Sequence, residues 1–288
     1  MVRNRGYDPL GMVGLRTIMG QSEGNREVAI GLIDGPVATD HPDLADSNIH
    51  HLDQRQANRG SDAHEHGTYI AGFLAARRSS PGPAICPNCT VLVRPIFLAA
   101  STRHAGTLSA SPDELADAIV ECVDARAQVL NLSLAVNEPS AKREQRLAQA
   151  LNYAAQRGVL VVAAAGNQGT VGGSAITQHP WVIAVAACDV RGRPMQTSNL
   201  SSTIGRRGLM APGQTITSLD ARGGTTTSSG TSAAVPFVTG SIALLRSIFP
   251  SAEPTKVKTA IVTAFGQRRS VVPPLLNATA AYQFMVRA

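Results

Sequence analysis

Short runs of β-branched and aliphatic residues alternate along the chain with segments of helical periodicity. Five runs have the length and composition of buried strands, namely Val28–Ile33, Val91–Val93, Val129–Ser133, Val159–Ala164 and Val182–Val185. Apolar residues at helical spacing lie between them at Pro112–Ala125, capped by Ser111, and at Ala141–Gln156, ended by Gly158, and a third helix is expected to begin near His66. Strands that alternate with helices form a parallel sheet with helices on both faces. The sequence therefore predicts an α/β fold.

No internal repeat, long linker or low-complexity tail interrupts this pattern in the 288 residues. A hydrophobic fraction of 43% is sufficient for one large core, and an aromatic fraction of 4% suits close packing of helices on a sheet. We expect a single domain that spans residues 1–288. Residues 1–27 form an N-terminal extension packed on it, in which Leu10–Met19 is expected to be helical.

The charge and the apolar runs argue against two classes of partner. The net charge of +6 is mild for this length, and no basic stripe interleaved with aromatic residues occurs, so we expect no nucleic-acid partner. No apolar run reaches about 18 residues, so we expect no membrane span. The N-terminus has no apolar segment of the signal-peptide kind, which favours a cytoplasmic protein.

Four cysteines are present, and two of them form the motif Cys86-Pro-Asn-Cys89. A structural zinc site needs a second pair, whereas Cys122 and Cys188 are isolated. We therefore predict no metal here and expect free thiols. A bridge from Cys86 or Cys89 to Cys122 stays open.

Polar residues occur where the predicted strands end and where helices begin. Asp34 directly follows the first strand, and Asn167 lies in a glycine-rich segment after the fourth. His66 precedes Gly-Thr at a predicted helix, and Ser232 lies in Gly230-Thr-Ser-Ala-Ala-Val-Pro236, which leads into an apolar helical run. Because a parallel sheet gathers its chemistry at the carboxyl ends of its strands, these side chains are expected to lie near one another.

Together the four side chains supply the groups needed for acyl transfer to a serine. Ser232 is the candidate nucleophile and His66 the base that takes its proton, while Asp34 would hold the imidazole in the required tautomer. The side-chain amide of Asn167 would stabilise the developing oxyanion. No cofactor is needed for this chemistry, and the partner it implies is a peptide.

Each residue also has a structural interpretation when taken alone. Ser232 or its neighbour Thr231 could be only a helix N-cap, and Asp34 before glycine could be only a turn residue. Asn167 could occupy a left-handed turn, and His64 competes with His66 for the part of the base. The order Asp, His, Ser along the chain favours the catalytic interpretation, because it is the order found in subtilisin.

Four blocks of the chain resemble the motifs of the subtilisin-like serine proteases, or subtilases. They are Ile33-Asp34-Gly35 with His41–Leu44, then His66–Gly72, Val161–Asn167 and Gly230–Pro236. The resemblance runs from about Val28 to Ala264 and implies a three-layer sandwich with a mostly parallel central sheet. It also implies that Ser133, Leu134, Ala135, Ala165 and Gly166 bind substrate. His66 is preferred over His64 because it carries the Gly-Thr that follows the family histidine.

A narrower likeness extends to the maturation proteases of cyanobactin pathways, which cut ribosomally made precursor peptides. It rests on Asp34–Val37, on Ala84–Cys89 and on Arg94–Phe97. Only residues 35–65 separate Asp34 from His66, which leaves little room for the helical cap of the macrocyclising branch. The resemblance therefore implies a serine endopeptidase that hydrolyses a precursor peptide.

Three alternatives remain open at this stage. A general intracellular degradative subtilase and a macrocyclase or transamidase share all the catalytic residues, and a pseudoenzyme that only binds peptides shares the fold.

Many subtilases also hold calcium, for which Asp43 matches one carboxylate. The segment Arg77–Ile85 is basic and poor in oxygen ligands, so no calcium site is expected there. The oligomeric state is not predicted.

Overall fold

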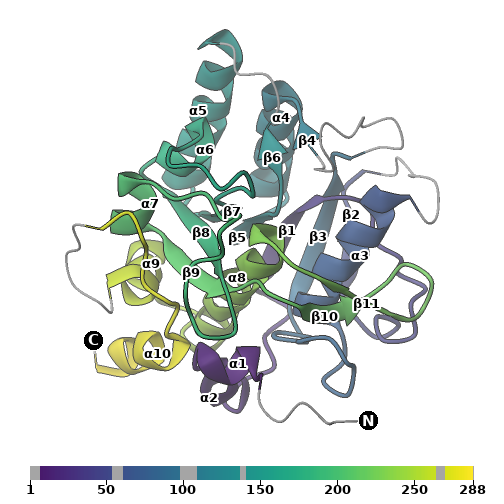
Figure 1. The fold of residues 1–288 in the computed structure, drawn as a ribbon. Helices are drawn as coiled ribbons and strands as arrows, with labels where there is room; N and C mark the ends of the chain where they lie inside the picture. The colour runs from purple at the N-terminus through teal and green to yellow at the C-terminus, as the bar shows by residue number, and fades with distance from the viewer. Residues whose placement is uncertain (1–6, 54–60, 98–108, 137–140, 264–269, 288) are drawn as a thin grey trace.

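The computed structural model describes residues 7–53, 61–97, 109–136, 141–263 and 270–287, and the remaining residues are drawn as a thin grey trace in Figure 1. Its central sheet has the strand order β2-β3-β1-β5-β7-β8-β9, and each neighbouring pair is parallel. The strands are β1 (Ala29–Asp34), β2 (Ile49–His51), β3 (Thr90–Pro95), β5 (Val129–Leu132), β7 (Leu160–Ala164), β8 (Val182–Cys188) and β9 (Leu209–Pro212). The predicted α/β architecture with a parallel sheet is confirmed.

Two apolar clusters cover the two faces of this sheet. One contains the buried side chains of α2 (Leu15–Met19), α3 (Asp62–Ala75), α8 (Thr231–Ile248) and α9 (Pro254–Thr263), and the other contains those of α4 (Pro112–Asp124) and α5 (Ala141–Gln156). The remaining helices are α1 (Pro9–Met12), α6 (Ala175–Gln178), α7 (Ser202–Arg207) and α10 (Ala278–Arg287). Two small two-stranded sheets complete the fold, β4 (Ser109–Ala110) with β6 (Ala135–Val136) and β10 (Ile216–Leu219) with β11 (Thr225–Ser228).

The five predicted strands are present, with boundaries that agree to within three residues. The caps of the helices follow from their sequence, since the Ser111 hydroxyl accepts the Glu114 N–H at the start of α4, and Gly158 adopts φ +68° after α5. The sequence analysis did not identify β2, β9, β10 and β11. These strands are three or four residues long, and a short run gives no clear periodicity.

Two helix predictions were wrong in position. Helix α3 begins at Asp62, with Ser61 as its N-cap, so His66 lies inside the helix and not at its start. Leu10–Met19 is not one helix, because Gly14 adopts φ +69° and separates α1 from α2. Helix α2 packs on the body of the protein through Leu15 and Ile18, both fully buried. The division of the chain into one domain with an extension stays a prediction.

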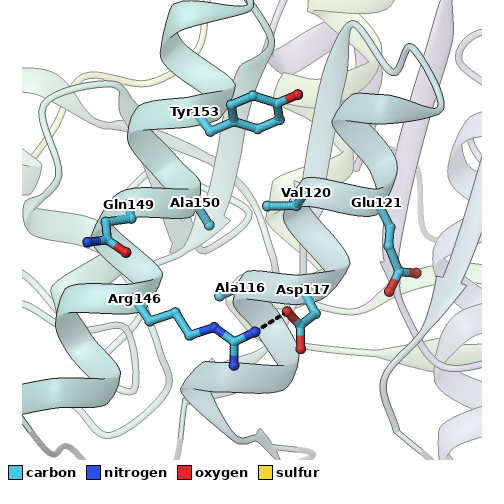
Figure 2. A pocket seen from close by; sticks show the side chains of 8 residues that line it. All are labelled: Ala116, Asp117, Val120, Glu121, Arg146, Gln149, Ala150 and Tyr153. Carbon is cyan, nitrogen blue, oxygen red and sulfur yellow. Dashed lines mark hydrogen bonds and ion pairs between the residues drawn. The ribbon is translucent and has the colours of Figure 1, made fainter.

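Helices α4 and α5 pack side by side and leave a shallow groove of about 440 Å³ on their outer surface (Figure 2). Arg146 reaches across it to Asp117, and the Tyr153 hydroxyl donates to Asp124 over 2.6 Å. These contacts link the two helices at the surface, and their buried apolar side chains pack in one cluster beneath. None of the predicted site residues lines this groove.

Candidate active site

Asp34 and His66 form a hydrogen-bonded pair at the carboxyl end of β1. Nδ1 of His66 lies 2.6 Å from Oδ1 of Asp34, whose side chain is fully buried. A carboxylate only accepts, so Nδ1 carries the proton, and the other ring nitrogen, Nε2, is left as an acceptor. His64, the competing histidine, is instead buried in the first turn of α3, where its backbone N–H donates to the Ser61 hydroxyl over 3.3 Å.

Two glycines allow α3 to approach β1 closely enough for this pair to form. A Cβ atom added at Gly35 would lie 1.8 Å from the backbone oxygen of Ala63, and one added at Gly67 would lie 2.3 Å from that of Pro36. The backbones of the β1–α3 loop and of α3 are therefore in direct contact. Gly35 is therefore required for this close approach.

Asp34 controls the protonation of His66. Burial disfavours the charged imidazolium, but the Asp34 charge and its hydrogen bond outweigh that effect and raise the pKa of His66 above its ordinary value of 6.5. The His66 side chain remains 23% exposed, so its free nitrogen is accessible. Oδ1 of Asp34 also accepts the Gly35 N–H over 2.6 Å, while Oδ2 has no hydrogen-bond partner among the described residues.

Ser232 is the second residue of α8, and its hydroxyl does not cap the helix. The N-cap is Gly230, whose φ of +136° is accessible to glycine and strained for other residues. The side chain of Ser232 is therefore free of the capping role that was its alternative interpretation. It lies in the first turn of a helix, where free N–H groups and the helix dipole favour negative charge.

Pro236 is the sixth residue of α8 and therefore lies beyond the first turn, where a proline is ordinarily tolerated. A helix N–H at this position would donate to the carbonyl of Ser232, four residues earlier, and proline has none. The Ser133 hydroxyl lies 3.2 Å from that carbonyl oxygen and donates to it. The proline thus frees a carbonyl that links α8 to the end of β5.

A short chain of buried polar groups continues from this contact into the core. Asn131 donates its amide to the Ser133 hydroxyl over 2.9 Å, and its Oδ1 accepts the Thr239 hydroxyl over 2.9 Å. Asn131 and Thr239 are both fully buried, and the side chain of each has a hydrogen-bond partner. The network fixes the first turns of α8 relative to β5.

Asn167 is oriented by Thr231, the residue before Ser232. Its Oδ1 accepts the Thr231 N–H over 2.9 Å and the Thr231 hydroxyl over 3.0 Å. Because the oxygen is held in this way, the amide N–H₂ group is left to donate elsewhere. The left-handed positions of the segment are Gly166 and Gly169 rather than Asn167, so the turn interpretation of Asn167 was wrong. The sequence analysis had considered Thr231 only as a possible cap.

The five residues expected to bind substrate lie at the ends of β5 and β7. Ser133, Leu134 and Ala165 are almost fully buried, at 4%, 6% and 8% exposure, and Gly166 is half-buried. The Ser133 hydroxyl is engaged with Ser232, and Leu134 packs in the core beneath α4 and α5. Ala135 begins β6, which pairs in parallel with β4. The five residues are thus grouped, although their contact with substrate stays a prediction.

Among the described residues, no group of three or more histidine, cysteine or acidic side chains is arranged to hold a metal ion. Asp43, the one carboxylate expected at a calcium position, accepts Arg77 Nε over 2.5 Å. The four cysteines are free and buried. Cys86 and Cys89 belong to the apolar cluster on one face of the sheet and Cys122 to the cluster on the other, so the structure does not form the bridge left open by the sequence.

One of the described helices, α8, is long and apolar enough to cross a membrane by composition, with a mean hydropathy of 1.3. In the folded protein it is the central helix of the core, and 78% of it is buried.

Comparison with known proteins agrees with this arrangement. Residues 25–279 match the Subtilase family. A thermophilic serine proteinase of Bacillus sp. (strain AK1) is 35% identical over 229 residues, which are 78% of this chain and 54% of that protein. The chain therefore spans about half the length of this relative.

Two solved structures have the same fold over nearly the whole chain. The prenylagaramide maturation protease PagA is 28% identical, with a TM-score of 0.82 over 94% of this chain and 98% of that chain. The patellamide maturation protease PatA is 29% identical, with a TM-score of 0.76 over 92% and 99%.

Proposed function

The chain belongs to the subtilase family of serine proteases, and we propose that Asp34, His66 and Ser232 are its catalytic triad and Asn167 its oxyanion donor. The single observation that carries this proposal is the contact of 2.6 Å between His66 Nδ1 and the buried Asp34 carboxylate. This contact leaves the Nε2 atom of an accessible imidazole free to act as a base. Further support comes from the two hydrogen bonds that Thr231, the residue before Ser232, donates to Asn167 Oδ1.

In the proposed reaction, Ser232 Oγ attacks the peptide carbonyl carbon, and its proton passes to His66 Nε2. Asp34 stabilises the imidazolium, and the Asn167 amide donates to the oxyanion. The C–N bond then breaks, the leaving amine takes the proton from His66, and an acyl-serine remains. Water attacks this ester with His66 as base, which releases the carboxylic acid and restores Ser232.

We assign contact with the bound peptide to Ser133, Leu134, Ala135, Ala165 and Gly166. These residues lie at the ends of β5, which pairs with β1, and of β7, which pairs with β5, so they lie at the same edge of the parallel sheet as Asp34. Their backbone is the part available for pairing, because Ser133 and Leu134 have buried side chains.

The natural substrate proposed for this protease is a ribosomally made precursor peptide, which it cleaves during maturation. Support comes from the likeness to PagA and PatA, two maturation proteases, over more than nine-tenths of the chain. The rival substrate is unfolded protein in general, as for a degradative subtilase. Both substrates would use the same triad.

Labelling with a fluorophosphonate tests the triad directly. Wild-type protein should gain one label, located by mass spectrometry on Ser232, and both His66→Ala and Asp34→Asn should slow the labelling strongly. Ser232→Ala should not be labelled at all, whereas His64→Ala should be labelled at the wild-type rate. Label on another serine, or a dead His64→Ala variant, would contradict the assignment.

The substrate is tested by incubation with casein and with peptides that carry the leader and core of a precursor. A maturation protease should cut the precursor at one position and leave casein largely intact. The masses of the two products should sum to the mass of the precursor plus 18 Da, because hydrolysis of one peptide bond adds one water. Rapid casein degradation would favour the general protease, and a core released without gain of water would indicate cyclisation.

A further inference from the structure

A pocket of about 420 Å³ is lined by residues at the start of α4, in the first half of α5 and in and just before α6. Figure 1 shows the arrangement of these three helices. Its apolar walls come from Pro112, Leu147 and Ile176, and its polar groups are those of Glu144, Ser174 and Gln178. This pocket is separate from the groove of Figure 2, which lies on the outer surface of the same two helices.

Two segments connect this pocket to the proposed catalytic groups. Pro112 follows β4, which pairs with β6, and β6 comes directly after Ser133 and Leu134. Gly173 and Ser174 end the loop that begins at Asn167. Because Ser133 also bonds to the Ser232 carbonyl, these segments link the pocket to the start of α8.

The walls of the pocket suit a long aliphatic stem. Leu147 and Ile176 are 1% and 4% exposed, so both are held in the core and form a fixed apolar floor of which only the edge reaches the pocket. Burial of a side chain against such a surface is favourable in proportion to the apolar area removed from water. The volume is sufficient for the longest side chains of a peptide.

The polar groups of the pocket are already satisfied, with one exception. Ser174 and Thr177 form a reciprocal capping box at the start of α6, and Gln178 donates to the Gly173 carbonyl over 3.3 Å. The side chain of Glu144 is half-buried and has no hydrogen bond or ion pair with any residue that the structure describes. It is the one titratable side chain in the lining of this pocket.

The nearest described arginine on the same helix does not neutralise Glu144. Arg146 is two residues further along α5, and side chains at that spacing do not face each other. Figure 2 shows Arg146 turned into the outer groove, where it is bound to Asp117. The Glu144 carboxylate is therefore available for a cation brought by a ligand.

We propose that Glu144 makes this pocket a subsite for a lysine or arginine side chain of the substrate. The stem would lie against Pro112, Leu147 and Ile176, and the charged end would pair with the carboxylate. The inference rests on the proposed peptidase function and adds to it the chemical class of one substrate residue. It makes Glu144 a specificity-determining residue and gives it no part in bond cleavage.

The test uses a proteome-derived peptide library whose cleavage sites are read by mass spectrometry. Wild-type protein should show enrichment of lysine and arginine at one fixed position near the scissile bond. Glu144→Gln should abolish the enrichment and lower kcat/KM by roughly ten-fold for a lysine peptide, with little change for its norleucine analogue. Glu144→Lys should favour an acidic residue there. Glu27→Gln, which removes an exposed carboxylate outside the pocket, is the matched control and should behave as wild type.

The outcomes separate the two proposals. Cleavage with no preference for lysine or arginine, or an equal preference in Glu144→Gln, overturns the subsite and leaves the peptidase function intact. Absence of both peptide cleavage and fluorophosphonate labelling in the wild type overturns the function and the subsite with it. Fluorophosphonate labelling of Glu144→Gln at the wild-type rate shows that the variant is folded, so its loss of preference then supports the subsite.

Discussion

The Ser133 hydroxyl donates to the carbonyl oxygen of Ser232 over 3.2 Å, at the one position of α8 where Pro236 removes the helical donor. A residue at the end of β5 thus replaces the hydrogen bond that the helix lacks. The position of the proposed nucleophile relative to the sheet depends on this replacement.

Ser133→Ala should leave the Ser232 carbonyl without a donor and cost about 1–3 kcal/mol of unfolding free energy. Pro236→Ala restores an N–H that can donate to the same carbonyl, so the cost of Ser133→Ala should fall by about 1 kcal/mol in that background. Urea unfolding of the four proteins measures this coupling. Additive effects would mean that the hydroxyl does not replace the helical donor.

Asn167→Ala should lower kcat by roughly 10²–10³ with little change in KM, because the amide serves a charge present only in the transition state. The range comes from the corresponding asparagine of subtilisin, a member of the same family. Thr231→Val keeps the N–H that holds Asn167 and loses only the hydroxyl, so its loss should be smaller. Steady-state kinetics on one peptide measures both, and an effect on KM alone would assign Asn167 to ground-state binding.

The pH dependence of activity should reflect the raised pKa of His66. The base must be neutral, so kcat/KM should fall as the pH drops through a value above 6.5. The stability contribution runs the other way. Since the folded pKa is raised, the Asp34–His66 attraction is fully present below pH 6.5 and is lost as the pH rises through the folded value. Asp34→Asn should move the acid-side fall of kcat/KM to lower pH and reduce kcat by roughly 10⁴. If the acid-side fall does not move, a group other than His66 causes it.

Gly35→Ala should destabilise the protein and separate His66 from Asp34, because the new Cβ would overlap the Ala63 backbone oxygen at 1.8 Å. A loss of more than about 2 kcal/mol is expected, as for other overpacked backbone contacts. Gly172→Ala is the control, since nothing lies within 4 Å of its Cβ, and it should change stability by less than about 0.5 kcal/mol. Thermal unfolding and fluorophosphonate labelling follow both changes. Equal behaviour of the two variants would contradict the close approach.

Chelation should leave the melting temperature and activity unchanged. Calcium-dependent relatives gain folding free energy from the bound ion, but Asp43 is already paired with Arg77, and Ca²⁺ needs six to eight oxygen ligands. A thermal shift measurement with and without EGTA checks this. A drop of several degrees that added Ca²⁺ restores would reveal a cation site not recognised in the structure.

The sequence by itself determined the α/β class, five strands of the central sheet (β1, β3, β5, β7 and β8) and the candidate residues of the site. It could do so because apolar periodicity, glycines and caps are local signals. Asp34, Asn167 and Ser232 could be found since each lies at the end of a strand or the start of a helix. The motif order then connected them. Short strands such as β9 (Leu209–Pro212) carried too few residues for such a signal.

Only the tertiary structure decided which partners these residues have. The contact of Ser133 with Ser232 spans 99 positions of the chain and that of Asn167 with Thr231 spans 64, and no local pattern encodes either. The same limit hid the pocket around Glu144, whose walls come from three separate helices. Local signals fix the elements, whereas contacts between side chains far apart in sequence exist only once the elements have packed.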